Sequence, residues 1–106
     1  MSSNETKKNI YKIDNETNTR MAQFLKVFGD ETRLRILFLL EEKEYTVTEL
    51  VEKISMTKSA ISHQLKTLKD NRIVKMRKVG KNIYFSLNDD HVSKILNITV
   101  EHIKEE

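Results

Sequence analysis

The chain has 106 residues, of which 38% are hydrophobic and 33% are charged, and it carries a formal net charge of +3 with an isoelectric point near 9.1. This length fits one small domain with a modest core, which dimerisation would help to stabilise, and so mild a positive charge permits an anionic partner without indicating one. The absence of cysteine excludes disulfides and thiolate metal sites. No apolar run is long enough to span a bilayer or to form a signal peptide, so we expect a cytoplasmic protein without a membrane partner.

The first third of the chain divides into a polar arm and two predicted helices. Residues 1–18 are polar and aperiodic, which predicts a flexible N-terminal arm, and residues 19–106 are expected to form the folded domain. The first helix ends at Gly29, and Asp30 caps a second helix whose apolar run 34–40 should be the most buried segment. The residues of the first helix expected to face the core are Met21, Phe24, Leu25 and Phe28.

Two further short helices are predicted in the middle of the chain. Thr46 and Glu49 have the spacing of a capping box, which begins a third helix, and a fourth helix begins near Thr57. The fourth helix has two contrasting faces. Its inward residues are Ala60, Ile61, Leu65 and Leu68. Its outward stripe consists of Ser59, Ser62, His63 and Lys66. Short polar side chains are unusual on a merely solvated face, which favours Glu and Lys, so this stripe suggests a binding surface.

The remaining sequence predicts a β-hairpin and a last helix. In residues 82–87 the hydrophobic period changes to two, which is typical of a strand, and Gly80 marks the hairpin turn. The segment from Asp90 is helical again. The predicted fold is therefore mainly α with a β-hairpin wing, an α+β arrangement. Two short helices followed by a basic hairpin form a winged helix-turn-helix.

This fold predicts binding to double-stranded DNA, with the fourth helix in the major groove. Ser59, Ser62 and His63 have the right length to reach base edges, and Lys58 and Lys66 should contact phosphates. Four basic residues of the hairpin should contact the backbone beside the groove: Lys75, Arg77, Lys78 and Lys81. A basic hairpin alone is more simply a solvated edge, but its combination with the helix pair and the polar stripe favours DNA binding.

Catalysis is not expected. Ser62 and His63 are neighbours on a helix and diverge by about 100°, so they cannot act as nucleophile and base. We therefore predict no catalytic residue and no small organic substrate.

Three stretches of the chain resemble the ArsR/SmtB family of bacterial metal-responsive repressors: GDETRLRILFLL, TVTELVEKISMTKSAISHQLKTLKDNRIV and KVGKNIYFSL. The S-x-x-S-H-Q-L core of the fourth helix is especially similar. The resemblance implies a homodimer that binds a palindromic operator and loses DNA affinity when it binds metal. Many members carry a metal-binding C-V-C-D/E-L motif at the start of the third helix. Residues 46–50 read Thr-Val-Thr-Glu-Leu, so that site is absent.

A second metal site of the family lies on the last helix, and this sequence matches its pattern at every position. The ligands implied by the resemblance are Asp89, His91, His102 and Glu105. Eleven residues separate the two histidines by about 16 Å and return them to almost the same face, because each residue rises about 1.5 Å and turns about 100°. One helix cannot close a site with both. Two antiparallel helices around a twofold axis would form two four-ligand sites, which suit tetrahedral Zn²⁺, with Co²⁺ as a surrogate.

The apolar residues of the last helix should contact two different neighbours. Ile95 and Ile98 lie on the face of the histidines and should contact a partner helix. The residues expected to pack on the body of the domain are Val92, Leu96 and Ile103.

The same four polar residues also admit an interpretation without metal. Glu105 could pair with His102 at the surface, and Asp89 or Asp90 could merely cap the helix. Asp90 could also replace Asp89 as a ligand if the helix begins late.

The sequence thus predicts a zinc-responsive repressor that binds operator DNA as a homodimer and is released when metal binds between the C-terminal helices. The alternative is a metal-blind winged-helix repressor. A third hypothesis is a protein-interaction domain that uses the fold without reading DNA.

Overall fold

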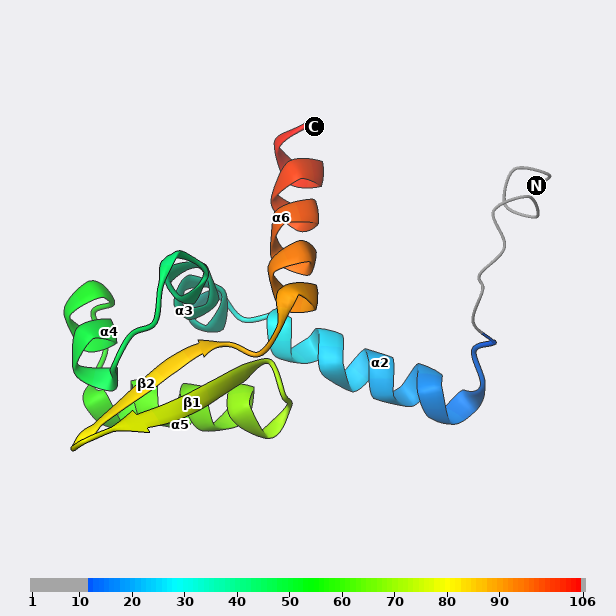
Figure 1. Ribbon diagram of the computed structural model, residues 1–106. Coiled ribbons are helices and arrows are strands. Elements are labelled where there is room, and N and C mark those ends of the chain that lie inside the picture. Colours follow the sequence, from blue (N-terminus) through cyan, green and yellow to red (C-terminus); the bar gives the residue numbers. More distant parts are fainter. Residues whose placement is uncertain (1–11, 106) are drawn as a thin grey trace.

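The computed structural model describes residues 12–105, which form five helices and one antiparallel two-stranded sheet (Figure 1). In chain order the elements are α2 (Asn15–Phe28), α3 (Glu31–Glu42), α4 (Val47–Lys53), α5 (Lys58–Asp70), β1 (Val74–Val79), β2 (Asn82–Leu87) and α6 (Asp90–Lys104). The predicted order of four helices, a hairpin and a last helix is confirmed, and with it the winged helix-turn-helix fold. None of the helices in residues 12–105 has the length and hydrophobicity needed to cross a membrane.

The helices begin at polar caps that the sequence indicates. Asp30 caps α3 as predicted, and α5 begins near Thr57 as predicted, with Thr57 itself as the cap. The capping box of α4 is also confirmed, because the Glu49 amide donates to the Thr46 hydroxyl at 3.2 Å and the Thr46 amide donates to the Glu49 carboxylate at 2.8 Å. These caps fix where each helix of the helix-turn-helix begins.

We expect Thr46→Ala to lower the free energy of unfolding by about 1 kcal/mol, because the Glu49 amide loses its side-chain acceptor. Thr48→Ala is the matched control, since Thr48 is exposed on the same helix and does not cap it. Urea unfolding followed by circular dichroism measures both changes. Thr48→Ala should leave the stability unchanged or raise it slightly, because alanine has the higher helix propensity. A Thr46→Ala variant as stable as Thr48→Ala would show that the cap contributes nothing.

Helix α2 begins at Asn15, four residues before the predicted start. The Asp14 carboxylate accepts a hydrogen bond from the Thr17 amide at 2.8 Å, and this bond lowers the pKa of Asp14. Polar residues 15–18 are therefore helical, because a cap rather than hydrophobic periodicity sets the start. The part of the predicted arm in residues 1–11 lies outside the described residues.

The predicted core face of α2 is only partly correct. Phe28 is buried and Phe24 packs beside it with a ring distance of 5.2 Å, but Met21 and Leu25 are 47% and 52% exposed. The physical reason is that α2 extends away from the body of the domain, so only its C-terminal part reaches the core (Figure 1).

The core lies between α3, α4, α5 and the start of the hairpin. The run 34–40 of α3 contributes three buried residues, whereas Leu34, Phe38 and Leu39 are only partly buried. The prediction that this segment is the most buried therefore holds for one side of the helix. The largest fully buried side chains are Ile36, Leu37, Leu50, Ile61, Leu65, Leu68, Ile73 and Val74.

The hairpin is held to the body by the loop between α3 and α4. Gly80 makes the turn with φ of 62°, a left-handed conformation that favours glycine. Tyr45 exchanges two backbone hydrogen bonds with Phe85 of β2, at 3.1 and 2.8 Å. The loop thus adds a short extra edge to the sheet.

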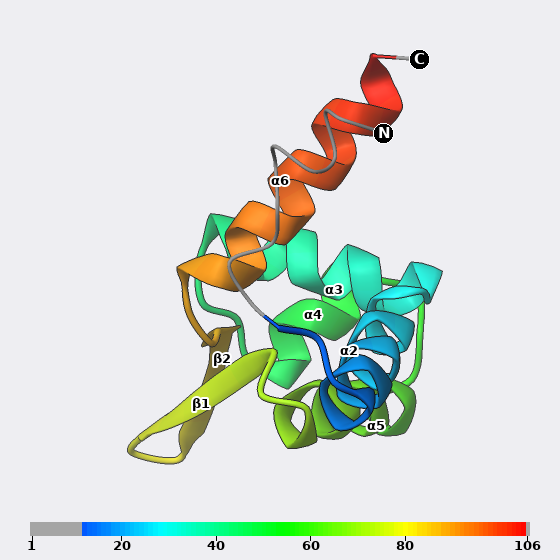
Figure 2. The same ribbon diagram turned by 90° about the vertical axis from the view of Figure 1, so that its right-hand side faces the viewer.

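Helix α6 rises away from the other elements (Figure 2). Val92 and Leu96 are buried against the body, as predicted. Ile103 is 56% exposed, so it is not buried against the body as predicted, because it lines an open hollow between α2, α3 and α6. Ile95 is partly buried and Ile98 is 66% exposed.

Candidate nucleic-acid interface and metal ligands

The outward face of α5 presents the predicted polar stripe. Its four residues, Ser59, Ser62, His63 and Lys66, are exposed, as is Lys58 in the first turn. The opposite face is buried through Ile61, Leu65 and Leu68. The helix is therefore fixed by its apolar side while its hydrogen-bonding side is accessible. Lys66 forms an exposed ion pair with Asp70 at 2.9 Å, a contact weak enough for a phosphate to replace.

Gln64 and Arg33 fix α5 against its neighbours, a role that no sequence pattern indicated. The Nε of Arg33 in α3 donates to the Gln64 side-chain oxygen at 2.7 Å, and its guanidinium also donates to the Val27 carbonyl of α2 at 3.4 Å. Gln64 is therefore turned toward the body and not outward with Ser62 and His63. The motif S-x-x-S-H-Q-L thus contains both exposed and positioning residues.

The four basic residues of the hairpin do not share one face. Strand alternation places Lys75 and Arg77 on one face and Lys78 on the other, while Lys81 lies in the turn. Arg77 is engaged by Glu44, whose carboxylate accepts from its Nε and Nη2 at 2.7 Å each. In the described part of the chain the three lysines form no ion pair. They are therefore the cations of the hairpin available to an incoming phosphate.

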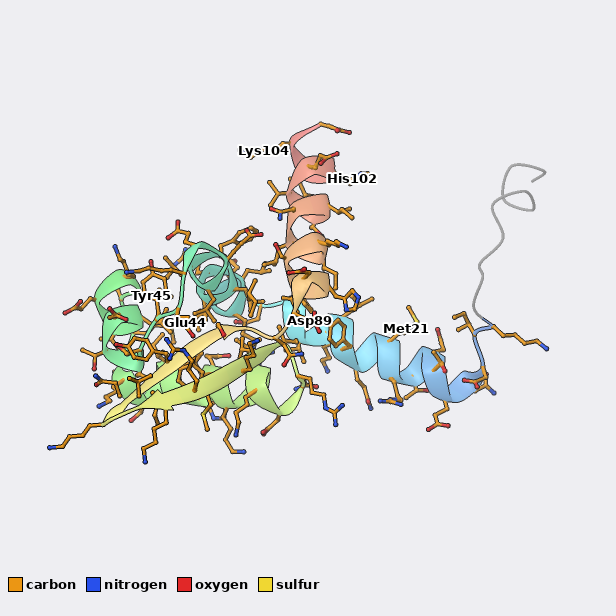
Figure 3. The ribbon with its side chains drawn as sticks, viewed as in Figure 1. Met21, Glu44, Tyr45, Asp89, His102 and Lys104 are labelled. Carbon is orange, nitrogen blue, oxygen red and sulfur yellow. The ribbon has the colours of Figure 1, made fainter. Side chains whose placement is uncertain are left out.

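The four predicted metal ligands are exposed and lie in two pairs at opposite ends of α6. Asp89 and His91 are at its start, and His102 and Glu105 are at its end. Figure 3 shows Asp89 and His102 at these two ends. Within residues 12–105 no three histidine, aspartate or glutamate side chains gather as a metal site. A site made from all four residues would therefore need a second chain.

Asp89 is also the N-cap of α6. Its Oδ1 accepts from the His91 amide at 3.0 Å and the Val92 amide at 3.4 Å, and its Oδ2 accepts from the Asn88 side chain at 3.1 Å. The Asn88 hydrogen bond is the main cause that lowers the pKa of Asp89, with the helix amides adding to it. The carboxylate is thus held in its anionic form, 3.5 Å from the Nδ1 of His91. Capping by Asp89, one of the two roles considered for this residue, is present.

A hollow of about 460 Å³ lies where α2, α3 and α6 meet, and its lining is mainly apolar. A second hollow adjoins it and shares Leu25 and Ile95 with it, so a continuous apolar surface runs between α2 and α6. We call it the α2–α6 surface and define it by Met21, Leu25, Ile95 and Ile103. A small domain rarely leaves such a surface without a partner.

The chain is similar to known bacterial regulators. Residues 30–76, which contain α3, α4, α5 and the start of β1, match the family described as bacterial regulatory protein, arsR family. A transcriptional repressor SmtB homolog of Synechocystis sp. is 38% identical over 86 residues, which cover 81% of this chain and 65% of the repressor. The chain therefore matches less than two thirds of that relative's length.

Two other proteins match a larger share of their own length. A cadmium resistance transcriptional regulatory protein CadC homolog of Staphylococcus aureus is 33% identical over 103 residues, covering 96% of this chain and 83% of the relative. A homodimeric winged helix-turn-helix DNA-binding domain from Mycobacterium bovis, solved in solution, superposes with a TM-score of 0.80 at 22% identity and covers 92% of this chain and 93% of that domain. The last similarity is one of fold.

Proposed function

Because the chain belongs to the ArsR family of bacterial regulatory proteins, we propose that it is a zinc-responsive transcriptional repressor that binds operator DNA as a homodimer and is released by metal. Membership in this family makes it a transcriptional regulator and not an enzyme. The CadC homolog is described as a cadmium resistance regulator, which supports a metal signal here. The SmtB homolog is described as a repressor, which supports the direction of control.

DNA recognition is assigned to α5 and the hairpin. The support is the exposed stripe of Ser59, Ser62 and His63, which can donate and accept hydrogen bonds at base edges in the major groove. Lys58 and Lys66 flank the stripe and suit phosphates, as do Lys75, Lys78 and Lys81 in the wing.

A second copy of the chain is the partner that we assign to the α2–α6 surface. Met21, Leu25 and Ile103 are each about half exposed in one chain, and a twofold axis would cover them with the same residues of the partner. The Mycobacterium bovis domain of the same fold is homodimeric, which supports this assignment. A dimer also sets two α5 helices at a fixed spacing, which a palindromic operator requires.

The metal assignment is carried by the two donor pairs at opposite ends of the exposed face of α6. Asp89 and His91 of one chain and His102 and Glu105 of its partner would supply two imidazole nitrogens and two carboxylate oxygens, a donor set that fits Zn²⁺. When bound, the cation would fix four donor groups from two chains in a tetrahedral arrangement. Four protein donors leave no open position for water, which suits a sensor and not a hydrolytic site.

Polar contacts provide a connection from α6 to the DNA-reading helix. The Glu41 carboxylate of α3 accepts from the Ser93 hydroxyl at 2.6 Å and from the Asn97 side chain at 2.7 Å, both on α6. At its other end α3 holds α5 through Arg33 and Gln64. A changed angle between two α6 helices would therefore displace α3 and α5 together. Coupling of this kind is typically about 1–3 kcal/mol, which corresponds to a 5- to 150-fold loss of DNA affinity.

A Co²⁺ titration of the metal-free protein, followed by addition of Zn²⁺, tests this function. We expect intense visible ligand-field bands that saturate at about one metal per chain and disappear with Zn²⁺, because tetrahedral nitrogen and oxygen donors bind both ions. The same protein should bind a duplex selected from random-sequence DNA about 5- to 150-fold more weakly with Zn²⁺ than with a chelator. Equal DNA affinity in both conditions would instead identify a metal-blind repressor.

A further inference from the structure

Arg77 differs from the other cations of the wing because it is already held by a carboxylate of the body. Two hydrogen bonds of 2.7 Å join its guanidinium to both oxygens of Glu44. The ring of Tyr84, directly opposite on β2, lies 5.5 Å from the guanidinium carbon. A bidentate pair of this kind fixes orientation as well as distance. The Arg77–Glu44 pair therefore defines where β1 lies relative to the loop that carries Glu44.

The surroundings of Glu44 make it a fixed point. The next residue, Tyr45, is 3% exposed and exchanges two backbone hydrogen bonds with Phe85. Figure 3 shows Glu44 and Tyr45 side by side next to the hairpin. The backbone of this loop thus holds β2, while the Glu44 side chain reaches across to Arg77 on β1. Both strands of the wing are fastened to the same two residues.

The charges of the pair compensate each other. The hydrogen bonds from Arg77 lower the pKa of Glu44, and those to Glu44 raise the pKa of Arg77, so the pair favours the charged form of both groups. Glu44 is more buried than its partner, with 34% of its side chain exposed against 59% for Arg77. If a DNA phosphate bound Arg77 in place of Glu44, the Glu44 carboxylate would lose its ion-pair partner while lying next to negatively charged DNA. Arg77 is accordingly a poor phosphate contact in spite of its charge.

We propose that Arg77 is a positioning residue for DNA binding, which sets the angle of the wing through Glu44 and leaves the phosphate contacts to the lysines. This role differs from the sequence-based expectation, which placed Arg77 among the phosphate contacts. It rests on the proposed binding of DNA by α5 and the wing. Glu44 then supports DNA binding although it carries the same sign of charge as DNA.

Two substitutions and two controls separate the two roles of Arg77. Glu44→Gln removes a negative charge near DNA, which would strengthen binding if Glu44 merely competed with phosphates for Arg77. Arg77→Lys keeps the charge but loses the bidentate geometry. Lys81→Gln, in the turn of the hairpin, is the control for a phosphate contact, and Glu52→Gln on α4 is the control for loss of an exposed carboxylate.

Fluorescence anisotropy measures the affinity of each variant for a duplex selected by the wild type. The salt concentration is varied from about 50 to about 200 mM, a range over which phosphate contacts make the affinity fall steeply. We expect Glu44→Gln and Arg77→Lys each to weaken binding by about 3- to 10-fold with an unchanged salt slope. Lys81→Gln should lower the magnitude of the salt slope by about 1.8, which is about 0.9 for each of the two wings of the dimer. The double variant of Glu44 and Arg77 should be no weaker than the single variants, because both remove one contact.

Tighter binding by Glu44→Gln together with wild-type affinity of Arg77→Lys would overturn the positioning role and make Arg77 a phosphate contact. We expect each variant to fold, because the pair lies at the surface and not in the core. Circular dichroism at the assay temperature checks this. A wild type that selects no duplex from random-sequence DNA would overturn the proposed function, and the positioning role with it. The two failures are therefore distinguishable.

Discussion

Replacement of Leu37 by alanine is expected to lower the free energy of unfolding by about 3 kcal/mol, within the range of about 2–5 kcal/mol for buried leucines. Leu37 has no exposed surface and lies on the side of α3 that faces the core. The substitution removes buried methyl groups and leaves a cavity that a close-packed core fills only partly. A domain of this size has about 5–15 kcal/mol in total, so the expected loss is a large fraction of its stability.

Leu39→Ala is the matched control for this prediction, because Leu39 lies on the same helix and is only partly buried. Its loss should be clearly smaller, since less apolar surface leaves water at that position on folding. Urea unfolding of the two variants at the same protein concentration gives both values. Losses of equal size would mean that the burial of Leu37 does not set its contribution, since alanine has the higher helix propensity and the exchange costs nothing on that account.

Local signals were sufficient to predict where most elements begin. Asp30 and the pair Thr46 and Glu49 cap their helices as expected, and α5 begins near Thr57 as expected, because an N-cap acts on amides within three residues of itself. Gly80 was equally predictable as the turn of the hairpin. The start of α2 was missed because the polar residues after Asp14 show no hydrophobic periodicity, although the cap itself is a local signal.

The partners of exposed helix faces could not be predicted in the same way. Periodicity shows that one side of α2 and one side of α6 are apolar, but it does not show whether the same chain covers them. Met21, Leu25 and Ile103 satisfy the helical pattern and are nevertheless about half exposed. Their position depends on how far each helix extends past the body, which is a property of the whole fold.

Long-range polar contacts were also beyond the sequence, and the roles that we propose for Arg33, Glu41 and Arg77 rest on them. Arg33 and Gln64 are 31 positions apart, Glu44 and Arg77 are 33 apart, and Glu41 meets Ser93 across 52 positions. No spacing rule links residues at such distances. Charge alone placed Arg77 with the lysines of the hairpin, whereas only the fold identifies Glu44 as its partner.

His102→Ala is expected to weaken Zn²⁺ binding by at least about 100-fold and to abolish release from DNA by zinc, while metal-free DNA binding stays near that of wild type. The reason is separation in space, because His102 lies near the far end of α6, away from the hairpin and α5 (Figure 3). Competition with a chromophoric chelator measures the metal affinity, and anisotropy measures DNA binding. His63→Ala should show the opposite pattern, since His63 is exposed on α5 and, within residues 12–105, belongs to no cluster of three possible metal ligands.

Equal mixing of His91→Ala and His102→Ala chains tests whether each site is shared between subunits. Neither homodimer has a complete site, because each of its two metal sites lacks one imidazole. In a heterodimer one site lacks both imidazoles, but the other takes His91 from one chain and His102 from its partner and is complete. Random exchange makes half of the dimers heterodimers, so the mixture should regain about one tight site per four chains. Sites closed within one chain would regain none. Recovery would therefore locate the donors in two subunits, as the separation of the pairs along α6 requires.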